Sequence, residues 1–244
     1  MLLPMTEAQY GEWVAKHYDE LHAERCAPEA VDPVVDFLVE RAGDGPVLEL
    51  GIGTGRIAVP LSRRGVQVHG IELAPAMVAQ LRTKTSEIEV TIGDFANTTA
   101  AGRFSLVYLV YNTITNLTTQ DEQVECFRNA AAHLEPGGRF VIENYIPHLQ
   151  RLPPGETKYV FDATPTHVGI EEYDVAAQLA VSHHWSVVDG VLRVSSSTHR
   201  YLWPAELDLM ACMAGLELRE RWAGWDRSPF TAESRSHLSV WQKP

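Results

Sequence analysis

The residues of clearest chemical interest lie in one short loop. Glu49, Gly51, Gly53 and Gly55 occupy every second position between an apolar run and a helical segment. Glycine allows the backbone to turn sharply and lets a ligand approach the main chain closely. In a parallel sheet, loops at the carboxyl ends of the strands form the ligand site. We therefore expect this loop to bind a cofactor.

The chemistry of the loop distinguishes two kinds of cofactor. Dinucleotide enzymes use G-x-G-x-x-G at this place, with the pyrophosphate at the helix N-terminus. Here Arg56 stands at the third glycine position. A carboxylate such as Glu49 favours a cationic ligand over a pyrophosphate. An NAD-dependent oxidoreductase is thus an alternative that the loop disfavours.

Four segments together resemble the class I methyltransferases, whose cofactor is S-adenosylmethionine. The E-x-G-x-G-x-G spacing of residues 49–55 resembles motif I of that family, and the ammonium and sulfonium of the cofactor suit a carboxylate. Glu72 closes the next strand, where an acidic residue accepts hydrogen bonds from ribose hydroxyls. G-D-F at 93–95 is similar to the family's adenine motif, and P-G-G at 136–138 to its usual turn before the fifth strand.

The resemblance implies a role for each matching position, with S-adenosylhomocysteine as the product. It assigns the ribose to Glu72 and the adenine to Asp94 and Phe95, and it places Tyr111 and Asn112 beside the methyl group. The other cofactor-binding residues that we expect are Tyr10, Tyr18, Glu49, Gly51, Gly53, Gly55, Arg56, Leu73 and Met77. A core stripe on an N-terminal helix explains Tyr10 and Tyr18 equally well. A non-catalytic S-adenosylmethionine-binding protein is a second alternative.

Strands and helices must alternate to hold these residues at one edge of a sheet. The apolar pattern predicts strands at 47–50, 66–71, 88–92, 104–111 and 139–146, and helices at 56–63, 75–84 and 120–134. Near-continuous apolar strands between helices indicate a parallel sheet covered on both faces. We expect a doubly wound, Rossmann-like α/β fold, which the resemblance makes seven-stranded.

Residues 157–203 break this rhythm and predict an inserted antiparallel flap. Asp189-Gly190 is a strong two-residue hairpin signal. This turn pairs Val187 with Leu192 and His183 with Ser196 on one face, and it puts His184 on the other. The face with His183 is apolar and the face with His184 is polar and expected to be solvated, so we expect His183 to be the catalytic base or a substrate contact. A hydrogen-bonded structural histidine is the alternative.

The acceptor is expected to lie beside this flap. An antiparallel insertion after the fifth strand resembles the arrangement in aminosugar N,N-dimethyltransferases and glycine N-methyltransferase, which implies an amine or hydroxyl of a small metabolite as methyl acceptor. We expect Tyr145, Trp185, Arg200 and Trp225 to contact it. For Trp225, anchoring of the last hairpin is an equal alternative. Because methyl transfer from a sulfonium is an in-line displacement, alignment of the partners supplies most of the rate.

The chain is expected to form a single methyltransferase domain over residues 1–244. Within it we expect lid helices at 1–42, a cofactor-binding core at 46–146, the inserted sheet at 157–203, and a helix with the final strands at 204–244. A chain of this length can bury one core of ordinary size.

Composition excludes several other functions. The formal net charge of −12 disfavours nucleic acid as a partner. No apolar run approaches the roughly 18 residues of a membrane span, and the first residues lack the pattern of a secretory signal. Three widely separated cysteines suit a reducing cytoplasm. His183 and His184 point to opposite faces of a strand, so we expect no metal site. The oligomeric state is not determined by the sequence.

Overall fold

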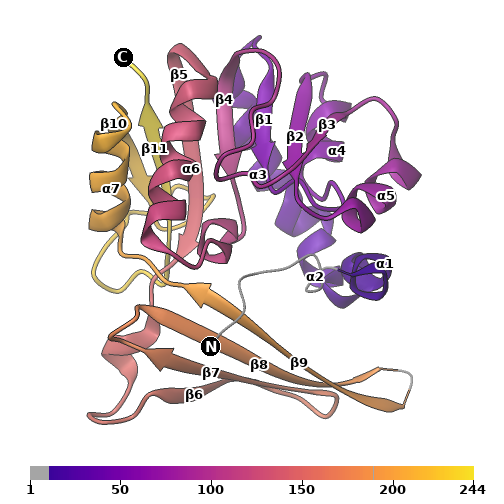
Figure 1. Ribbon diagram of the computed structural model, residues 1–244, viewed down its shortest axis with the longest axis vertical. Coiled ribbons are helices and arrows are strands. Elements are labelled where there is room, and N and C mark those ends of the chain that lie inside the picture. Colours follow the sequence, from indigo (N-terminus) through magenta and orange to yellow (C-terminus); the bar gives the residue numbers. More distant parts are fainter. Residues whose placement is uncertain (1–10, 189) are drawn as a thin grey trace.

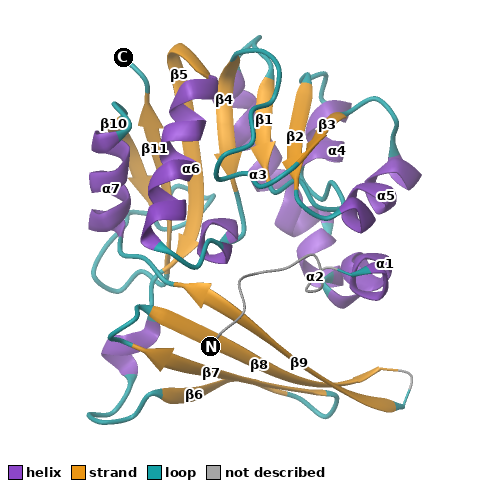
Figure 2. Cartoon of the chain, in the orientation of Figure 1, coloured by secondary structure: helices purple, strands orange, loops and turns teal. Residues whose placement is uncertain are grey.

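Two sheets of different construction make up the protein. The computed structural model describes residues 11–188 and 190–244 (Figure 1). A seven-stranded sheet has helices on both of its faces, and a separate four-stranded sheet lies below it in the view of Figure 2. The expected α/β fold with an antiparallel insertion after the fifth strand is therefore confirmed. The boundaries of the expected functional segments stay predictions.

The large sheet has the order β10-β11-β5-β4-β1-β2-β3. Strands β1 to β5 run parallel to one another, whereas β11 runs antiparallel to both β5 and β10. The strands are β1 (Val47–Leu50), β2 (Val68–Glu72), β3 (Glu89–Ile92), β4 (Phe104–Leu109), β5 (Leu134–Tyr145), β10 (Glu217–Trp222) and β11 (Ser236–Gln242).

Helices cover both faces of this sheet because its strands are apolar on both. One face is covered by α3 (Pro28–Ala42), α4 (Ala58–Arg63) and α5 (Pro75–Lys84), and the other by α6 (Gln120–His133) and α7 (Pro204–Met213). On the second face Phe127 packs edge-on against Phe140 and Trp241, with ring centroids 5.1 and 5.5 Å apart. Burial of such rings is a large apolar contribution to stability.

Local sequence signals explain several element boundaries. The hydroxyl of Thr119 accepts the amide of Glu122 at 3.2 Å, and the Glu122 carboxylate accepts the amide of Thr119 at 2.9 Å, which forms a capping box at the start of α6. Strand β4 ends two residues earlier than expected, because Tyr111 and Asn112 have left-handed φ values of 62° and 59°. An extended strand cannot continue through that conformation.

The inserted sheet has the order β6-β7-β8-β9 and is antiparallel throughout. Its strands are β6 (Lys158–Ala163), β7 (His167–Asp174), β8 (Leu179–Val188) and β9 (Val191–Arg200). The pairs Val187 with Leu192 and His183 with Ser196 are present, so the register expected from the turn is confirmed. A two-residue turn fixes the pairing of every residue behind it.

Two short helices lie at the N-terminal end of the described chain. They are α1 (Glu12–Leu21) and α2 (Ala23–Cys26), and Figure 1 shows them between the large sheet and the far end of the β8–β9 hairpin. Within residues 11–188 and 190–244, every helix is too short or too polar to cross a bilayer.

Candidate active site

The glycine loop after β1 needs glycine for two separate reasons. Gly51, Gly53 and Gly55 have φ values of 74°, 57° and 81°, a region that other residues rarely adopt. A Cβ on Gly55 would also lie 2.3 Å from Cδ1 of Leu81, and one on Gly51 would lie 2.8 Å from Cγ2 of Thr113. The loop is thus shaped by backbone conformation and by close packing against α5 and the segment after β4.

Glu72 holds this loop from the end of β2. Its Oε2 accepts the amide of Gly53 at 2.8 Å, and its Oε1 accepts the amide of Ala74 at 2.9 Å. Burial raises the pKa of the carboxyl, whereas hydrogen bonds from the backbone amides of Ala74, Gly53 and Leu73 oppose that shift. A carboxylate has about four lone-pair directions, so the three amides leave room for a further donor. Glu72 can therefore hold the loop and still accept hydrogen bonds from a ligand.

Glu49 forms its hydrogen bonds inside the protein. Its Oε2 accepts the hydroxyl of Tyr108 at 2.8 Å, and its carboxyl also accepts the amide of Ala58. Burial raises the pKa of Glu49 to about 8, which favours the neutral acid. In this structure the Glu49 side chain points toward α4 and is hydrogen-bonded within the protein, and its expected part in binding a cationic cofactor stays a prediction.

The segment after β3 brings an aromatic ring to the glycine loop. Phe95 is buried, and its ring edge lies 3.8 Å from the position of a Cβ on Gly51. Asp94 is half-buried and accepts the amide of Ala96 at 2.8 Å. The amide of Asn129 on α6 donates to the carbonyl of Phe95 at 2.9 Å. A second oxygen of Asp94 thus stays available beside a fixed ring.

Tyr111 and Asn112 form a strained corner at the carboxyl end of β4. Both have left-handed backbones, a conformation that costs of order 1–3 kcal/mol for each residue and collects at functional sites. The Glu143 carboxylate on β5 accepts the amide of Tyr111 at 2.9 Å, and the Asn112 side-chain oxygen accepts the amide of Tyr145 at 2.7 Å. Hydrogen bonds from β5 therefore fix this corner.

Cationic and aromatic groups surround the ring of Tyr111. The guanidinium carbon of Arg25 lies 4.0 Å and that of Arg56 lies 5.4 Å from its centroid, which gives favourable cation–π contacts. The ring of His22 stands edge-on at 6.4 Å. Burial, followed by Arg25 and Arg56, lowers the pKa of His22 to about 4. His22 is consequently neutral near pH 7.

Helix α1 is tied directly to the glycine loop. The hydroxyl of Thr54 donates to Oδ1 of Asp19 at 2.6 Å, and Lys84 forms an ion pair with the other oxygen of Asp19. Met77 is buried and packs with Ala15 and Tyr18. Burial raises the pKa of the Tyr18 hydroxyl. Leu73 is 39% exposed, and Tyr10 lies outside the described residues. The helix thus lies over the mouth of the loop.

Comparisons with known proteins fit this geometry. The methyltransferase-domain family matches residues 47–138. The cypemycin N-terminal methyltransferase of a Streptomyces species is 28% identical, over 93% of this chain and 97% of its own length. The solved structure of the CcbJ methyltransferase from Streptomyces caelestis is 38% identical, with a TM-score of 0.84 over 98% of this chain and 99% of that one. The chain belongs to the class I S-adenosylmethionine-dependent methyltransferases.

A third similarity concerns the fold alone. The S-adenosylmethionine-bound structure of CalS10, an amino pentose methyltransferase from Micromonospora echinaspora, has a TM-score of 0.71 at 21% identity, over 93% of this chain and 96% of that one. The methyltransferase is an enzyme whose cofactor is S-adenosylmethionine. The NAD-dependent and non-catalytic alternatives are therefore set aside.

Trp225 is connected to the candidate site of the methyltransferase through Glu143. Its indole nitrogen donates to Oε1 of Glu143 at 2.9 Å, and its ring stands edge-on to Phe37 at 5.4 Å. Glu143 thereby joins Trp225 to the backbone of Tyr111. This is the anchoring alternative rather than the expected stacking on an acceptor. Burial raises the pKa of Glu143.

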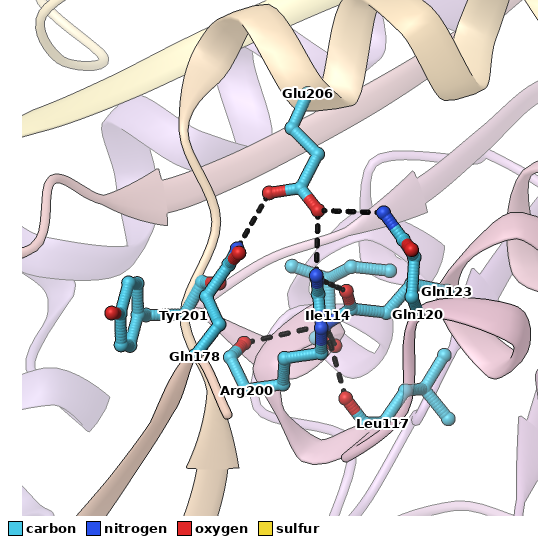
Figure 3. A network of polar contacts seen from close by, with 8 residues as sticks. All are labelled: Ile114, Leu117, Gln120, Gln123, Gln178, Arg200, Tyr201 and Glu206. Atoms are coloured by element: carbon cyan, nitrogen blue, oxygen red, sulfur yellow. Dashed lines mark hydrogen bonds and ion pairs between the residues drawn. The ribbon is translucent and has the colours of Figure 1, made fainter. Parts of the chain in front are cut away.

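Arg200 is used within the protein and not in an acceptor site. Figure 3 shows its guanidinium between Gln123 of α6 and Glu206 of α7. It donates to Glu206 at 2.7 Å, and the side-chain amide of Gln123 donates to the carbonyl of Arg200 at 3.2 Å. Arg200 is only 6% exposed. The expectation of acceptor binding is corrected, because these partners occupy the guanidinium where β9 joins the core.

The face of the inserted sheet that carries His183 and Trp185 points away from the site, whereas we expected it to point toward the site. Arg193 pairs with Ser186 and so shares the face of His184, and its guanidinium carbon lies 4.1 Å from the ring centroid of Trp13 in α1. The His184 face therefore meets the N-terminal helices. Side chains alternate along a strand, so His183 and Trp185 point away from the site. The apolar face points outward, and the polar face points inward.

Several residues that the sequence did not single out lie at the site. Glu143 fixes Tyr111, Asp19 fixes α1, and Glu171 and His199 lie on the inner face of the inserted sheet. Glu143 could have been singled out from the sequence, because it is a glutamate within the apolar strand 139–146. The positions of the others depend on how separate elements pack, which periodicity does not report.

Proposed function

We propose that the methyltransferase transfers a methyl group to the nitrogen of a small amine. The acceptor would lie between the carboxyl ends of β4 and β5 and the inner face of the inserted sheet. One observation carries this proposal: the Tyr145 hydroxyl and Nδ1 of His199 are buried, and neither has a hydrogen-bond partner among the described residues. Buried polar atoms normally have partners, so a polar ligand accounts for both.

The residues of the glycine loop fit the cofactor. Gly51 and Gly53 have no side chain to keep a ligand away from the loop backbone, and Glu72 and Asp94 offer oxygens at the ends of β2 and β3. Phe95 supplies a buried ring beside the loop. We assign the methionine part to the loop, the ribose to Glu72, and the adenine to Asp94 and Phe95. When bound, the cofactor supplies a methyl group activated by positive sulfur.

The two unpaired polar atoms lie on neighbouring elements, because His199 pairs with Ala180, a member of the cluster against which Tyr145 packs. Tyr145 packs with Tyr159, Tyr173 and Tyr201 at the base of the inserted sheet. Strand β9, which carries His199, packs against the short helix η2 (Thr113–Asn116) that follows Tyr111 and Asn112. This arrangement would hold an acceptor next to the strained corner, where alignment with the methyl group supplies the rate.

Glu171 favours an amine over a neutral hydroxyl in this space. It lies opposite Ser182, which hydrogen-bonds to it, and it is an electrostatic neighbour of the Tyr145 hydroxyl. Burial raises the pKa of Glu171 to about 7. A half-charged carboxylate in a shielded place attracts an ammonium or an amine hydrogen. Two similar proteins are named an N-terminal methyltransferase and an amino pentose methyltransferase, and these names are compatible with amine acceptors.

Binding and turnover experiments test the two parts separately. We expect calorimetric titration to show binding of S-adenosylmethionine and S-adenosylhomocysteine but not NAD, with strong loss in Glu72→Ala. We expect S-adenosylhomocysteine release with small primary or secondary amines and not with the matching alcohols. Release with alcohols alone would overturn the amine assignment, and absence of cofactor binding would overturn the site.

The cellular location and the class of acceptor are also proposals. We propose a cytoplasmic location, which three cysteines without disulfides support. We propose a small-molecule acceptor rather than nucleic acid, which the net charge of −12 supports.

A further inference from the structure

A chain of three hydrogen-bonded side chains crosses the inserted sheet. Oδ2 of Asp162 on β6 lies 2.5 Å from Nδ1 of His167 on β7. Nε2 of His167 lies 2.9 Å from Nδ1 of His184 on β8, and the two rings are stacked at 5.2 Å. Asp162 is 42% exposed, whereas the His167 side chain is 25% exposed. The chain therefore leads from solvent into the sheet.

The inner end of this chain faces the proposed acceptor space. His184 shares its face with Ser182, which hydrogen-bonds to Glu171, and with Arg193, which stacks on Trp13. His184 is an electrostatic neighbour of His22, and the ring of His22 contacts that of Tyr111. The Nδ1 atom of His184 bonds to His167, so Nε2 is the atom left for a ligand.

The carboxylate of Asp162 determines which nitrogen of each ring carries a proton. A carboxylate accepts hydrogen bonds, so neutral His167 carries its proton on Nδ1. Its Nε2 is then an acceptor, and His184 must donate to it from Nδ1. The remaining nitrogen of His184, Nε2, consequently has a free lone pair. Without Asp162 both rings could adopt the reverse tautomer, and Nε2 of His184 would then carry a proton.

We propose that His184 is the general base of methyl transfer and that His167 and Asp162 are its positioning residues. This inference rests on the proposed amine acceptor. The acceptor nitrogen donates its lone pair to the methyl carbon, and the carbon–sulfur bond breaks with its electron pair left on sulfur. The nitrogen, now positive, releases one proton to Nε2 of His184. The Nδ1 proton of His184 can then pass to Nε2 of His167, on the way to solvent.

The electrostatic surroundings keep His184 available as a base. Burial lowers its pKa, followed by His167 and His183, while Asp162 raises it. His22 and His199 face the same space from α1 and β9, and burial lowers the pKa of each to about 4. Glu171 and Asp162 are acidic groups on this face. His184 is thus unprotonated at neutral pH and gains a proton only during turnover.

Matched variants test the assignment of the base. Because a general base contributes about 100-fold or more, we expect His184→Gln to lower kcat by about that factor with an unchanged Kd for S-adenosylmethionine. His183→Gln is the control, since that ring bonds to Ser196 on the outer face at 2.8 Å, and we expect its kcat to stay within twofold. Imidazole in the buffer should restore part of the activity of His184→Ala. A normal kcat in His184→Gln, or an equal loss in His183→Gln, would overturn the proposal.

The tautomers can be measured without any acceptor. We expect nitrogen-15 spectra of the imidazoles in the folded protein to show His184 protonated on Nδ1, and Asp162→Asn to shift that proton toward Nε2. A parent protein with His184 protonated on Nε2 would contradict the relay. If the parent protein fails to methylate amines, the proposed function is overturned, but the tautomer of His184 can still be measured. A loss of kcat confined to Glu171→Gln would transfer the role of base to Glu171.

Discussion

The carboxylate of Glu143 accepts a hydrogen bond from the backbone amide of Tyr111 at 2.9 Å. This contact joins β5 to the first of two consecutive left-handed residues at the end of β4. The other oxygen of Glu143 accepts the indole of Trp225 at 2.9 Å. The hydrogen bonds of the Glu143 side chain therefore stabilise the strained corner at Tyr111 and Asn112, which packing contacts alone would not maintain.

Replacement of Glu143 should loosen this corner. In Glu143→Ala both donors lose their partner, and a buried unpaired donor costs about 1–3 kcal/mol. We expect a loss of unfolding free energy of that order and weaker cofactor binding, measured by urea unfolding and calorimetry. In Trp225→Phe only the indole hydrogen bond is lost. Full stability in both variants would show that the hydrogen bonds of Glu143 do not fix the corner.

The glycine loop offers a matched pair of substitutions. Gly55→Ala adds a Cβ that would lie 2.3 Å from Leu81 at a φ of 81°, so it combines overpacking of about 1–3 kcal/mol with left-handed strain. Gly65→Ala has a φ of 87° and open space around the new Cβ, so it carries only the strain of about 1–2 kcal/mol. Thermal unfolding should rank Gly55→Ala as clearly less stable, and its cofactor affinity should fall. Equal melting temperatures would contradict this.

Glu49 predicts a definite sign for the pH dependence of stability. Its pKa is raised from 4.5 to about 8 in the folded protein, so the folded state holds a proton that the unfolded state releases. The stabilisation is full below about pH 4.5 and is lost as the pH rises through 8. We expect Glu49→Gln, which stays neutral, to gain stability relative to the parent between pH 5 and pH 8. If urea unfolding gives the same difference in unfolding free energy between Glu49→Gln and the parent from pH 5 to pH 8, the raised pKa of Glu49 is refuted.

Tyr145→Phe separates stability from acceptor recognition. In the parent protein, the buried hydroxyl of Tyr145 has no hydrogen-bond partner in the described part of the chain, and such an unpaired group costs about 1–3 kcal/mol. We expect the free variant to be at least as stable as the parent. The KM for the acceptor should rise about tenfold, as for a lost hydrogen bond, while the Kd for S-adenosylmethionine stays constant. A drop in stability without a change in KM would identify the hydroxyl as structural.

Local sequence decided much of the fold. The glycine turn after β1 and the register of β8 with β9 appear as expected, and the capping box of Thr119 and Glu122 likewise follows from local sequence. Each depends on residues close in the chain, whose hydrogen bonds or sterics fix a conformation wherever the segment lies. The apolar residues of α3 also recur at helical spacing and are buried, among them Val31, Val34, Val35 and Leu38.

Only the tertiary structure decided which side of each element faces the site. A strand has two faces, and the sequence of β8 alone favoured the apolar one that carries His183. Docking against α1 turned the polar face of His184 inward instead. Likewise Glu49 lies in the expected motif, but Tyr108 from another strand takes its carboxylate. The sequence thus determined the elements and the cofactor loop, whereas packing between distant segments determined which side chains meet, because that choice depends on long-range contacts absent from any local pattern.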